Sequence, residues 1–369
     1  MSKKIKIMHI INNLEVGGAE KMLVLLLKEL SRRKDVDVYV VSLEGHGPLA
    51  GELPSRVLLK EFKYHLFLGG LLSKLDLNFR FGLYSYVRKI NPDIIHGHLF
   101  RGEDFAKTLG AITKTPVVTT SHDTLIWPGW KTRFLNKYLS RAIAVSKIVS
   151  KHLKVAYGVD KSRIKIIPNA IEAKLFERGK KKFDKSKPVF IYIGRLLKSK
   201  GIDDSIKGLA KLRNDYPNLE FLIYGKEVFK SYKDSLIRLV NKNKWDFVKF
   251  MGRTDDVPTA LQKGDIFVLP SQSEGFAISV LEAAAASKPV IATKVGAIDI
   301  LVENMKSGIF VEWHQPNQIY TAAKKILDEN LVEKYGIEAR KIARDSFDIK
   351  KVEQMHYDLY KKVLNGDKK

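Results

Sequence analysis

Short apolar runs alternate with amphipathic segments along this chain, and this alternation limits the fold more than any other feature. In the first half the expected strands are Ile5–Ile11, Val36–Leu43, Ile94–Gly97, Val117–Thr119, Ile143–Ser146 and Ile164–Ile167. In the second half they are Val189–Ile193, Leu219–Tyr224, Val248–Met251, Ile266–Leu269 and Val290–Ala292. Strands that alternate with helices form parallel sheets with helices on both faces. The sequence therefore predicts an α/β protein.

A lysine-rich stretch at residues 174–188 separates the two halves, holds few apolar residues and is typical of a linker. The chain has 369 residues, more than one hydrophobic core usually supports. We therefore expect one domain over residues 1–182 and a second that starts at residue 183.

The composition excludes several classes of protein. The chain has no cysteine, so disulfides, thiolate metal sites and cysteine nucleophiles are excluded. Its first apolar run ends at Ile11, which is too short for the core of a signal peptide. No stretch approaches the roughly 18 apolar residues of a transmembrane helix. These features predict a cytoplasmic protein.

The segment from Pro270 to Ala283 follows an apolar strand, turns at Gly275 and continues as a helix rich in alanine and leucine. Glu274 and Glu282 would lie about 12 Å apart along a helix axis, close to the length of a nucleotide diphosphate with its sugar. Free N–H groups at the helix start would bind the diphosphate. The alternative is a surface helix with two solvated glutamates.

A second candidate segment follows the expected strand Val189–Ile193. Gly194 allows the chain to turn, and Arg195 and Lys200 then stand where open α/β sheets bind ligands. A guanidinium and an ammonium there suit a departing diphosphate. The alternative is an ordinary basic loop, which is our interpretation of Lys198.

A third segment follows the first strand, where Gly17 and Gly18 precede a helix with a regular apolar face. Two glycines at a helix start leave backbone N–H groups accessible to a ligand. The spacing is not G-x-G-x-x-G, so a dinucleotide fingerprint is absent.

These three segments, in this order, resemble the retaining glycosyltransferases of the GT-B fold, in the large family 4 group (glycosyl transferases group 1). The matching patterns are the Gly-Gly-Ala-Glu that starts at Gly17, the Gly-Arg and Lys-Gly pairs of residues 194–201, and the two glutamates around Gly275. Ser121-His122 and residues 166–169 also match. The chain departs from the family at residues 170–172 and at the strand end that holds only Gly225, which affects contacts to the nucleotide base.

The resemblance implies two facing Rossmann-like domains, with the nucleotide-sugar domain at residues 183–345. Residues 346–369 would form a C-terminal helix that packs back on the first domain, the acceptor side. The donor is a nucleotide-diphosphate sugar, and no cofactor or metal is implied.

The resemblance also implies a role for each site residue. Arg195 and Lys200 would contact the diphosphate, Glu282 the ribose, and Glu274 and His122 the transferred sugar. The remaining donor-binding residues would be Gly17, Gly18, Gly275, Phe276, Ala277 and Ile278. His98 is a further candidate at the cleft, and His96 is expected in the core.

The implied activity is transfer of a hexose or N-acetylhexosamine to a glycan or lipid-linked acceptor, in the synthesis of cell-surface polysaccharide or glycolipid. Two alternatives remain open. One is a GT-B nucleotide-sugar 2-epimerase, which acts on the donor alone. The other is a non-catalytic module that binds polysaccharide or lipid.

The charge points to an anionic partner. The chain carries a net charge of +24, and residues 1–182 hold 33 Lys and Arg against 16 Asp and Glu. An anionic membrane or an anionic acceptor would fit, whereas no nucleic-acid recognition motif is present. Residues 62–86 favour the membrane, because Phe67, Leu68, Leu71 and Leu72 stand among Lys63, Lys74 and Arg80. The alternative is a core helix with a loop. We expect a peripheral protein at the inner face of the cytoplasmic membrane.

Overall fold

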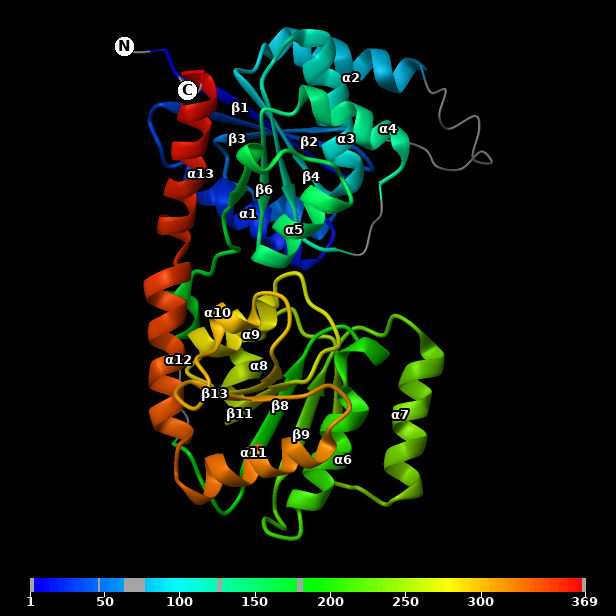
Figure 1. The fold of residues 1–369 in the computed structure, drawn as a ribbon, viewed down its shortest axis with the longest axis vertical. Helices are drawn as coiled ribbons and strands as arrows, with labels where there is room; N and C mark the ends of the chain where they lie inside the picture. The colour runs from blue at the N-terminus through cyan, green and yellow to red at the C-terminus, as the bar shows by residue number, and fades with distance from the viewer. Residues whose placement is uncertain (1–2, 46, 63–76, 125–127, 178–181, 367–369) are drawn as a thin grey trace. The chain divides into compact units, whose positions relative to one another are not determined.

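The computed structural model describes residues 3–45, 47–62, 77–124, 128–177 and 182–366. The chain forms two compact units, one of residues 1–170 and 349–369 and one of residues 171–348. Each unit is a parallel sheet covered by helices (Figure 1). The expected α/β fold with two parallel sheets is confirmed.

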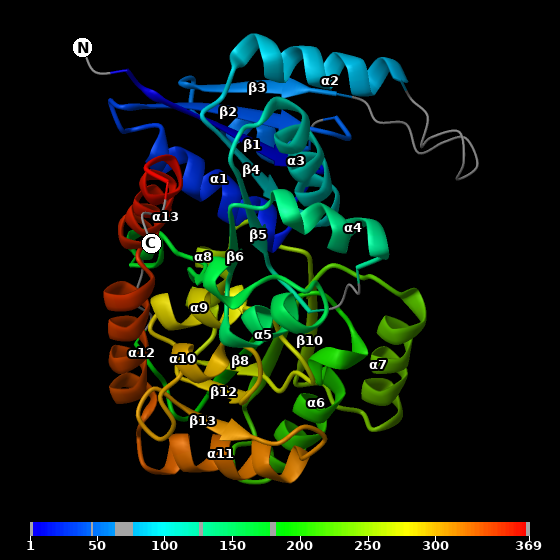
Figure 2. The same ribbon diagram turned by 45° about the horizontal axis from the view of Figure 1, so that its top comes forward.

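The first unit contains a seven-stranded sheet with the order β3-β2-β1-β4-β5-β6-β7. Its strands are β1 (Ile5–Ile11), β2 (Val36–Ser42), β3 (Val57–Glu61), β4 (Ile94–His98), β5 (Val117–Ser121), β6 (Arg141–Ala144) and β7 (Ile164–Ile166). Its helices are α1 (Gly18–Leu30), α2 (Leu77–Ile90), α3 (Leu99–Thr113), α4 (Trp130–Leu135), α5 (Lys147–Val155) and α13 (Ile349–Leu364). Helices α1 and α13 cover one face of the sheet, and α2 and α3 cover the other (Figure 2).

The second unit contains a six-stranded sheet with the order β10-β9-β8-β11-β12-β13. Its strands are β8 (Val189–Ile193), β9 (Glu220–Tyr224), β10 (Val248–Gly252), β11 (Ile266–Leu269), β12 (Val290–Thr293) and β13 (Gly308–Val311). Its helices are α6 (Ile202–Leu212), α7 (Lys230–Lys242), α8 (Val257–Lys263), α9 (Ile278–Ala285), α10 (Ile298–Leu301), α11 (Pro316–Asp328) and α12 (Val332–Phe347). Helix α6 packs on α11, and α9 packs on α12.

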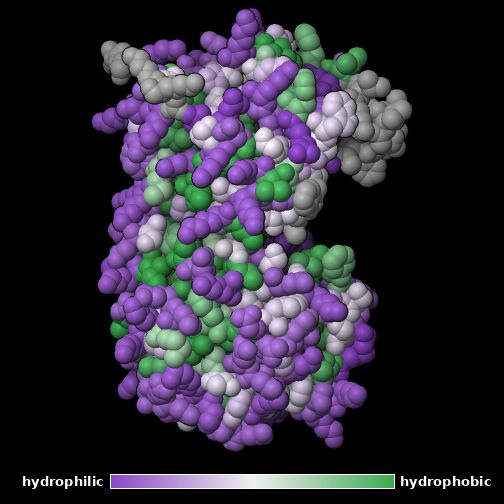
Figure 3. All heavy atoms as spheres, viewed as in Figure 1, coloured by the Kyte–Doolittle hydropathy of each residue, from purple (hydrophilic) through white to green (hydrophobic). Residues whose placement is uncertain are grey.

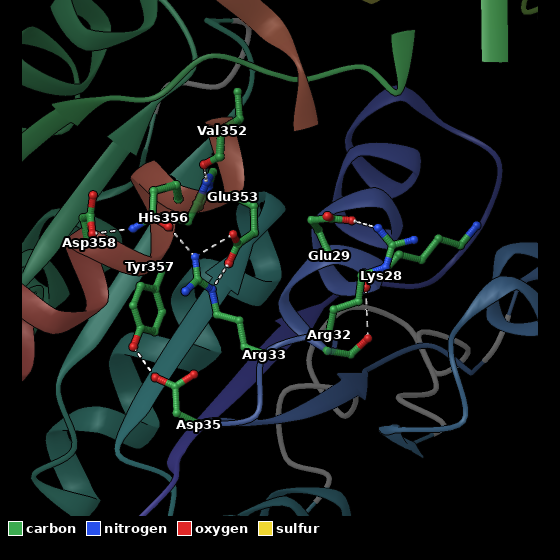
Figure 4. Close-up of polar contacts among 12 residues, drawn as sticks. Lys28, Glu29, Arg32, Arg33, Asp35, Val352, Glu353, His356, Tyr357 and Asp358 are labelled. Atoms are coloured by element: carbon green, nitrogen blue, oxygen red, sulfur yellow. Dashed lines mark hydrogen bonds and ion pairs between the residues drawn. The ribbon is translucent and has the colours of Figure 1, made fainter. Parts of the chain in front are cut away.

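The last helix belongs to the first unit, as expected. Helix α13 packs on α1, and Val352, Leu359 and Tyr360 are buried in the core that α1 also lines. Arg33, just after α1, donates two hydrogen bonds to Glu353, of 2.6 and 2.9 Å (Figure 4). Its guanidinium also lies 3.8 Å from the ring centroid of Tyr357. A charge-assisted pair with this geometry holds the helix in one register.

The unit boundaries lie at other residues than the linker composition suggested. The first division falls between Ala170 and Ile171, before residue 182, and the second between Asp348 and Ile349. The backbone N–H of Ile171 donates to the carbonyl of Phe347 at 2.9 Å, so the segment that enters the second unit pairs with the segment that leaves it. The boundary therefore lies ahead of the lysine-rich stretch.

Candidate functional site

The second unit places two loops side by side at the carboxyl end of its sheet. Strands β8 and β11 are neighbours, with Ile266 opposite Phe190 and Phe267 opposite Ile191. Strands β9 and β10 continue the sheet on one side, and β12 and β13 on the other. The point where the strand order reverses is where open α/β sheets bind ligands. The loops that follow β8 and β11 are the two segments that hold Arg195, Lys200 and Glu274.

Lys200 and Glu274 form an ion pair across these two loops. Lys200 Nζ lies 2.6 Å from Glu274 Oε1, and the two side chains are only 15% and 10% exposed. The hydroxyl of Ser271 donates to the same carboxylate oxygen at 2.7 Å. The two residues that the sequence assigned to the diphosphate and to the sugar are therefore in contact. Arg195, in the first of the loops, is exposed.

Close backbone contacts fix the shape of these loops. The N–H of Gln272 donates to the carbonyl of Ser199 at 2.8 Å. Gly201 and Gly296 both have a positive φ, and a Cβ would lie 2.3 Å from the Pro270 carbonyl oxygen at Gly201 and 2.2 Å from that of Glu274 at Gly296. Only glycine fits such positions without strain. These contacts fix the positions of Lys200 and Glu274 within the second unit.

A buried tyrosine, Tyr192, is hydrogen-bonded to the backbone of the loop that holds Arg195. The Tyr192 hydroxyl donates to the Arg195 carbonyl at 2.7 Å. Burial, and then the Glu274 carboxylate, raise the pKa of Tyr192 well above its ordinary value, so this hydroxyl stays protonated. The sequence analysis assigned no role to Tyr192, Ser271 or Gly296, although Tyr192 lies in the expected strand Val189–Ile193 and Ser271 in the segment from Pro270 to Ala283. The positive φ of Gly296 is visible only in the structure.

Helix α9 starts just after these loops. It begins at Ile278, with Ala277 as its N-cap residue and no side-chain cap. Gly275, Phe276 and Ala277 therefore form the turn that leads into it, and the first N–H groups of the helix point to the same edge of the sheet. Glu274 lies in the loop and Glu282 lies in the helix, where it is half-buried. Only one of the two carboxylates is therefore carried by the helix.

The remaining predicted residues lie in the first unit. Gly17 is the extended N-cap residue of α1, and Gly18 is the first residue of that helix. His122 follows β5 and is half-buried. It lines a small hollow with His98, His356, Thr120 and residues of α1, together with Asn169 of the Ile166–Asn169 match. His122 and His98, each a separate candidate from the sequence, therefore line the same small hollow.

Buried histidines gather on the face of the first sheet that α13 covers. His9 of β1 pairs in register with His96 of β4, and His9 Nδ1 lies 2.9 Å from His98 Nε2. His96 lies 2.7 Å from both the Tyr360 and the Thr120 hydroxyls. His96 therefore lies in the core, as expected. The sequence analysis did not identify this cluster, because His9 meets His96 only when the sheet order is known.

The ring nitrogens of His9, His96 and His98 lie within 4.8 Å of one another, so these are the described residues that could hold a metal ion. The hydrogen bonds among the rings and with the two hydroxyls already use most of these nitrogens; within the described residues, His9 Nε2 has no partner. We assign no metal to them.

Burial lowers the pKa of every histidine in this region. The pKa of His9 falls to about 3 and those of His122 and His356 to about 4, and those of His96 and His98 lie well below the ordinary value. Neighbouring histidines add to the effect through charge repulsion. These side chains are therefore neutral in the folded protein at pH 7.

This predicts a loss of stability in acid. Unfolded histidines take up protons below about pH 6.5, whereas the folded ones do not until their lowered pKa values are reached, so the stability is full above pH 6.5 and falls as the pH drops. Each such histidine contributes a slope of about 1.4 kcal/mol per pH unit. Urea unfolding between pH 7 and 4.5 measures this slope. His9→Asn should reduce the slope by the contribution of one histidine, about 1.4 kcal/mol per pH unit. An unchanged slope in that variant would show that His9 is protonated in the fold.

The segment proposed for membrane contact is only partly described. Residues 63–76, including Phe67, Leu68, Leu71, Leu72, Lys63 and Lys74, lie outside the described residues. The rest forms α2, which buries Phe79, Leu83 and Val87 in the first unit and leaves Phe81 72% exposed. The described part thus fits the alternative of a core helix. Among the described helices, none has the length and apolar character needed to span a bilayer. Hydrophilic side chains cover most of the molecular face that Figure 3 shows.

Comparison with known proteins supports the family resemblance that the sequence motifs indicate. Residues 173–342 match the family described as Glycosyl transferases group 1, and residues 16–175 match Glycosyltransferase Family 4. A glycogen synthase of Mycobacterium tuberculosis is 26% identical over 258 residues, which cover 66% of this chain and 62% of that protein, somewhat under two thirds of the relative's length. The UDP-Gal:alpha-D-GlcNAc-diphosphoundecaprenol alpha-1,3-galactosyltransferase of Escherichia coli is 24% identical and covers 97% of both chains.

Solved structures show the same fold. A glycosyltransferase from Rickettsia africae superposes with a TM-score of 0.84 at 20% identity and covers 99% of this chain and all of that one. Anabaena Alr3699/HepE, in complex with UDP and glucose, gives a TM-score of 0.81 at 20% identity and covers 97% of this chain and 99% of that one. At this identity the likeness concerns the fold alone.

Proposed function

We propose that this chain, which belongs to the group 1, family 4 glycosyltransferases with the GT-B fold, moves a sugar from a nucleotide-diphosphate sugar to a glycan or lipid-linked acceptor with retention of anomeric configuration. The observation that carries the proposal is the ion pair of Lys200 and Glu274, which joins the loop that also holds Arg195 to the loop that leads into α9. The solved relative with UDP and glucose and the curated galactosyltransferase support this class of donor and acceptor.

We assign a role to each candidate site residue of the second unit. The diphosphate lies at the start of α9, where the first N–H groups and the positive end of the helix dipole meet Arg195 and Lys200. Glu282, farther along the helix, accepts hydrogen bonds from the ribose. Glu274 orients the sugar, and its carboxylate accepts a hydrogen bond from Lys200.

The reaction breaks the bond between the anomeric carbon and the diphosphate oxygen, and the acceptor hydroxyl oxygen forms the new bond while its proton passes to the leaving diphosphate oxygen. Positive charge develops on the sugar and negative charge on the leaving diphosphate. Arg195 and Lys200 stabilise that negative charge. In the first unit, neutral His122 contacts the sugar as a hydrogen-bond partner without charge. Retention then follows from attack on the same face of the sugar–diphosphate ion pair.

Two other functions are distinguished from transfer by one experiment. A thermal-shift screen of UDP-, GDP-, ADP- and dTDP-sugars identifies the donor, because a ligand at a hundredfold excess over Kd stabilises the fold by about 2.7 kcal/mol. NMR then follows that donor alone and with added glycans or polyprenyl-diphosphate glycans. A transferase consumes it rapidly only with acceptor, a 2-epimerase changes it without acceptor, and a binding module leaves it intact. Either of the last two results would overturn the proposal.

The proposed chemistry needs no metal ion, because fixed cations and the start of a helix neutralise the diphosphate. We therefore expect turnover to continue in EDTA at the rate measured in buffer alone. Donor turnover with and without 5 mM chelator, and with Mg²⁺ added back, is the measurement. A complete loss of activity that Mg²⁺ restores would show that the cations of this site are insufficient.

A further inference from the structure

The short helical segment Trp130–Tyr138, which comprises α4 and the 3-10 turn Asn136–Tyr138, has two opposite faces. Its inner face is held by polar contacts within the first unit. The Thr132 hydroxyl donates to Asp104 at 2.9 Å, and the Asn136 amide donates to the Tyr157 carbonyl at 2.7 Å. With Leu135 also buried, the outer face is presented to solvent in a fixed orientation.

Every exposed residue of this segment is aromatic or basic. Trp130, Phe134 and Tyr138 are 82%, 56% and 40% exposed and recur at every fourth position, so they form one stripe on the helix. Lys131, Arg133 and Lys137 are exposed around this stripe. The Lys137 ammonium lies 3.7 Å from the Phe134 ring centroid and 4.8 Å from that of Tyr138. We call these six residues the α4 face.

The surroundings of the α4 face carry the same sign of charge. From Thr124 to Val159 the sequence has no acidic residue and seven Lys or Arg. The contact between Asn136 and Tyr157 joins the segment to the end of α5, where Lys151, Lys154 and Val155 are exposed. Residues 1–170 and 349–369 together hold 34 Lys and Arg against 17 Asp and Glu. A second copy of this surface would be repelled, whereas an anionic surface would be attracted.

We propose that the α4 face docks the first unit on an anionic lipid bilayer. Aromatic rings with basic neighbours are the side chains that settle at the boundary between headgroups and acyl chains, and each basic residue there adds to the attraction. A nucleic acid is less well matched, because proteins bind its single strands in a basic groove, whereas these rings stand on the exposed outer face of a helix. The inference rests on the proposed function in that a lipid-linked acceptor would be met at this surface, but binding itself needs no turnover.

Co-sedimentation with vesicles tests the docking. The full chain is mixed with vesicles of phosphatidylcholine alone or with 30% phosphatidylglycerol, at low and high salt. We expect binding to the anionic vesicles, weakened by salt because exposed charges are screened. The variant Lys131→Glu/Arg133→Glu/Lys137→Glu should bind at least about tenfold more weakly. Trp130→Ala/Phe134→Ala/Tyr138→Ala should also lose binding, although its charge is unchanged.

The matched control changes the same net charge elsewhere on the first unit, at the exposed residues Lys34, Lys60 and Lys362, each replaced by Glu. It should keep most of its binding. Equal losses in the control and the α4 variant, equal binding to neutral and anionic vesicles, no binding at all, or tighter binding to a single-stranded oligonucleotide would each overturn the proposal. Melting temperatures of the same variants check that the first unit, which holds all the changed residues, stays folded. Donor binding checks the second unit separately, so a failed docking leaves the proposed reaction untouched and a failed reaction leaves the docking untouched.

Discussion

We expect Lys200→Ala and Arg195→Ala each to lower kcat by about 10²-fold or more. The negative charge of the diphosphate grows as the anomeric bond breaks, so a cation that contacts it contributes more to the transition state than to the bound donor. The ion pair with Glu274 holds the Lys200 ammonium in a fixed position. Steady-state or single-turnover kinetics with the identified donor measure the loss.

A control for this prediction lies in the same loop. Lys198 is exposed, and the sequence interpretation assigns it no role. Lys198→Ala should therefore keep kcat near that of the unmodified chain, although it removes the same charge. If the Arg195 and Lys200 variants behave like the Lys198 variant, the leaving-group role belongs to other residues.

Replacing Glu274 and replacing Glu282 should affect different kinetic constants. Glu274→Ala should lower kcat strongly, because its carboxylate orients the reacting sugar and its removal leaves Lys200 with no counter-charge in a largely buried position. Glu282→Ala should mainly raise KM and the Kd of the donor, because the ribose does not react. Calorimetric donor binding beside kcat and KM distinguishes the two patterns, and the reverse assignment would mean that the two acids exchange roles.

The contact between Lys200 and Glu274 can be tested with a double variant. When two residues interact directly, their double variant costs less than the sum of the single ones. Lys200→Ala/Glu274→Ala should therefore lose less activity and less stability than the two single losses predict together. Additive effects would indicate that the ion pair is broken in the working enzyme.

The sequence predicted the sheets well where strands are buried on both faces. β8 and β11 have the expected bounds, because continuous apolar runs mark a fully buried strand. The edge strand β3 was not expected, since it alternates between buried and exposed residues. The strand expected at residues 143–146 lies at Arg141–Ala144, because Ser146 instead caps α5 and accepts from the Val149 N–H at 3.3 Å.

The sequence located the candidate residues along the chain but did not predict how they are arranged. Motifs located Arg195, Lys200 and Glu274 at the ends of strands. The contact between Lys200 and Glu274 spans 74 residues of sequence and depends on β8 lying beside β11. The histidine cluster depends in the same way on β1 lying beside β4. Pairing between distant strands is a property of the whole fold, which a local pattern does not contain.

The central claim is that the second unit binds a nucleoside diphosphate through Arg195, Lys200 and the start of α9. Isothermal titration of the full chain with UDP, GDP, ADP and dTDP tests it most directly. The account predicts that one of the four binds with a stoichiometry of one, without added metal, and that Arg195→Ala/Lys200→Ala weakens that binding by about tenfold or more while Lys198→Ala does not. No binding of any of the four, or binding that the double variant leaves unchanged, would contradict it.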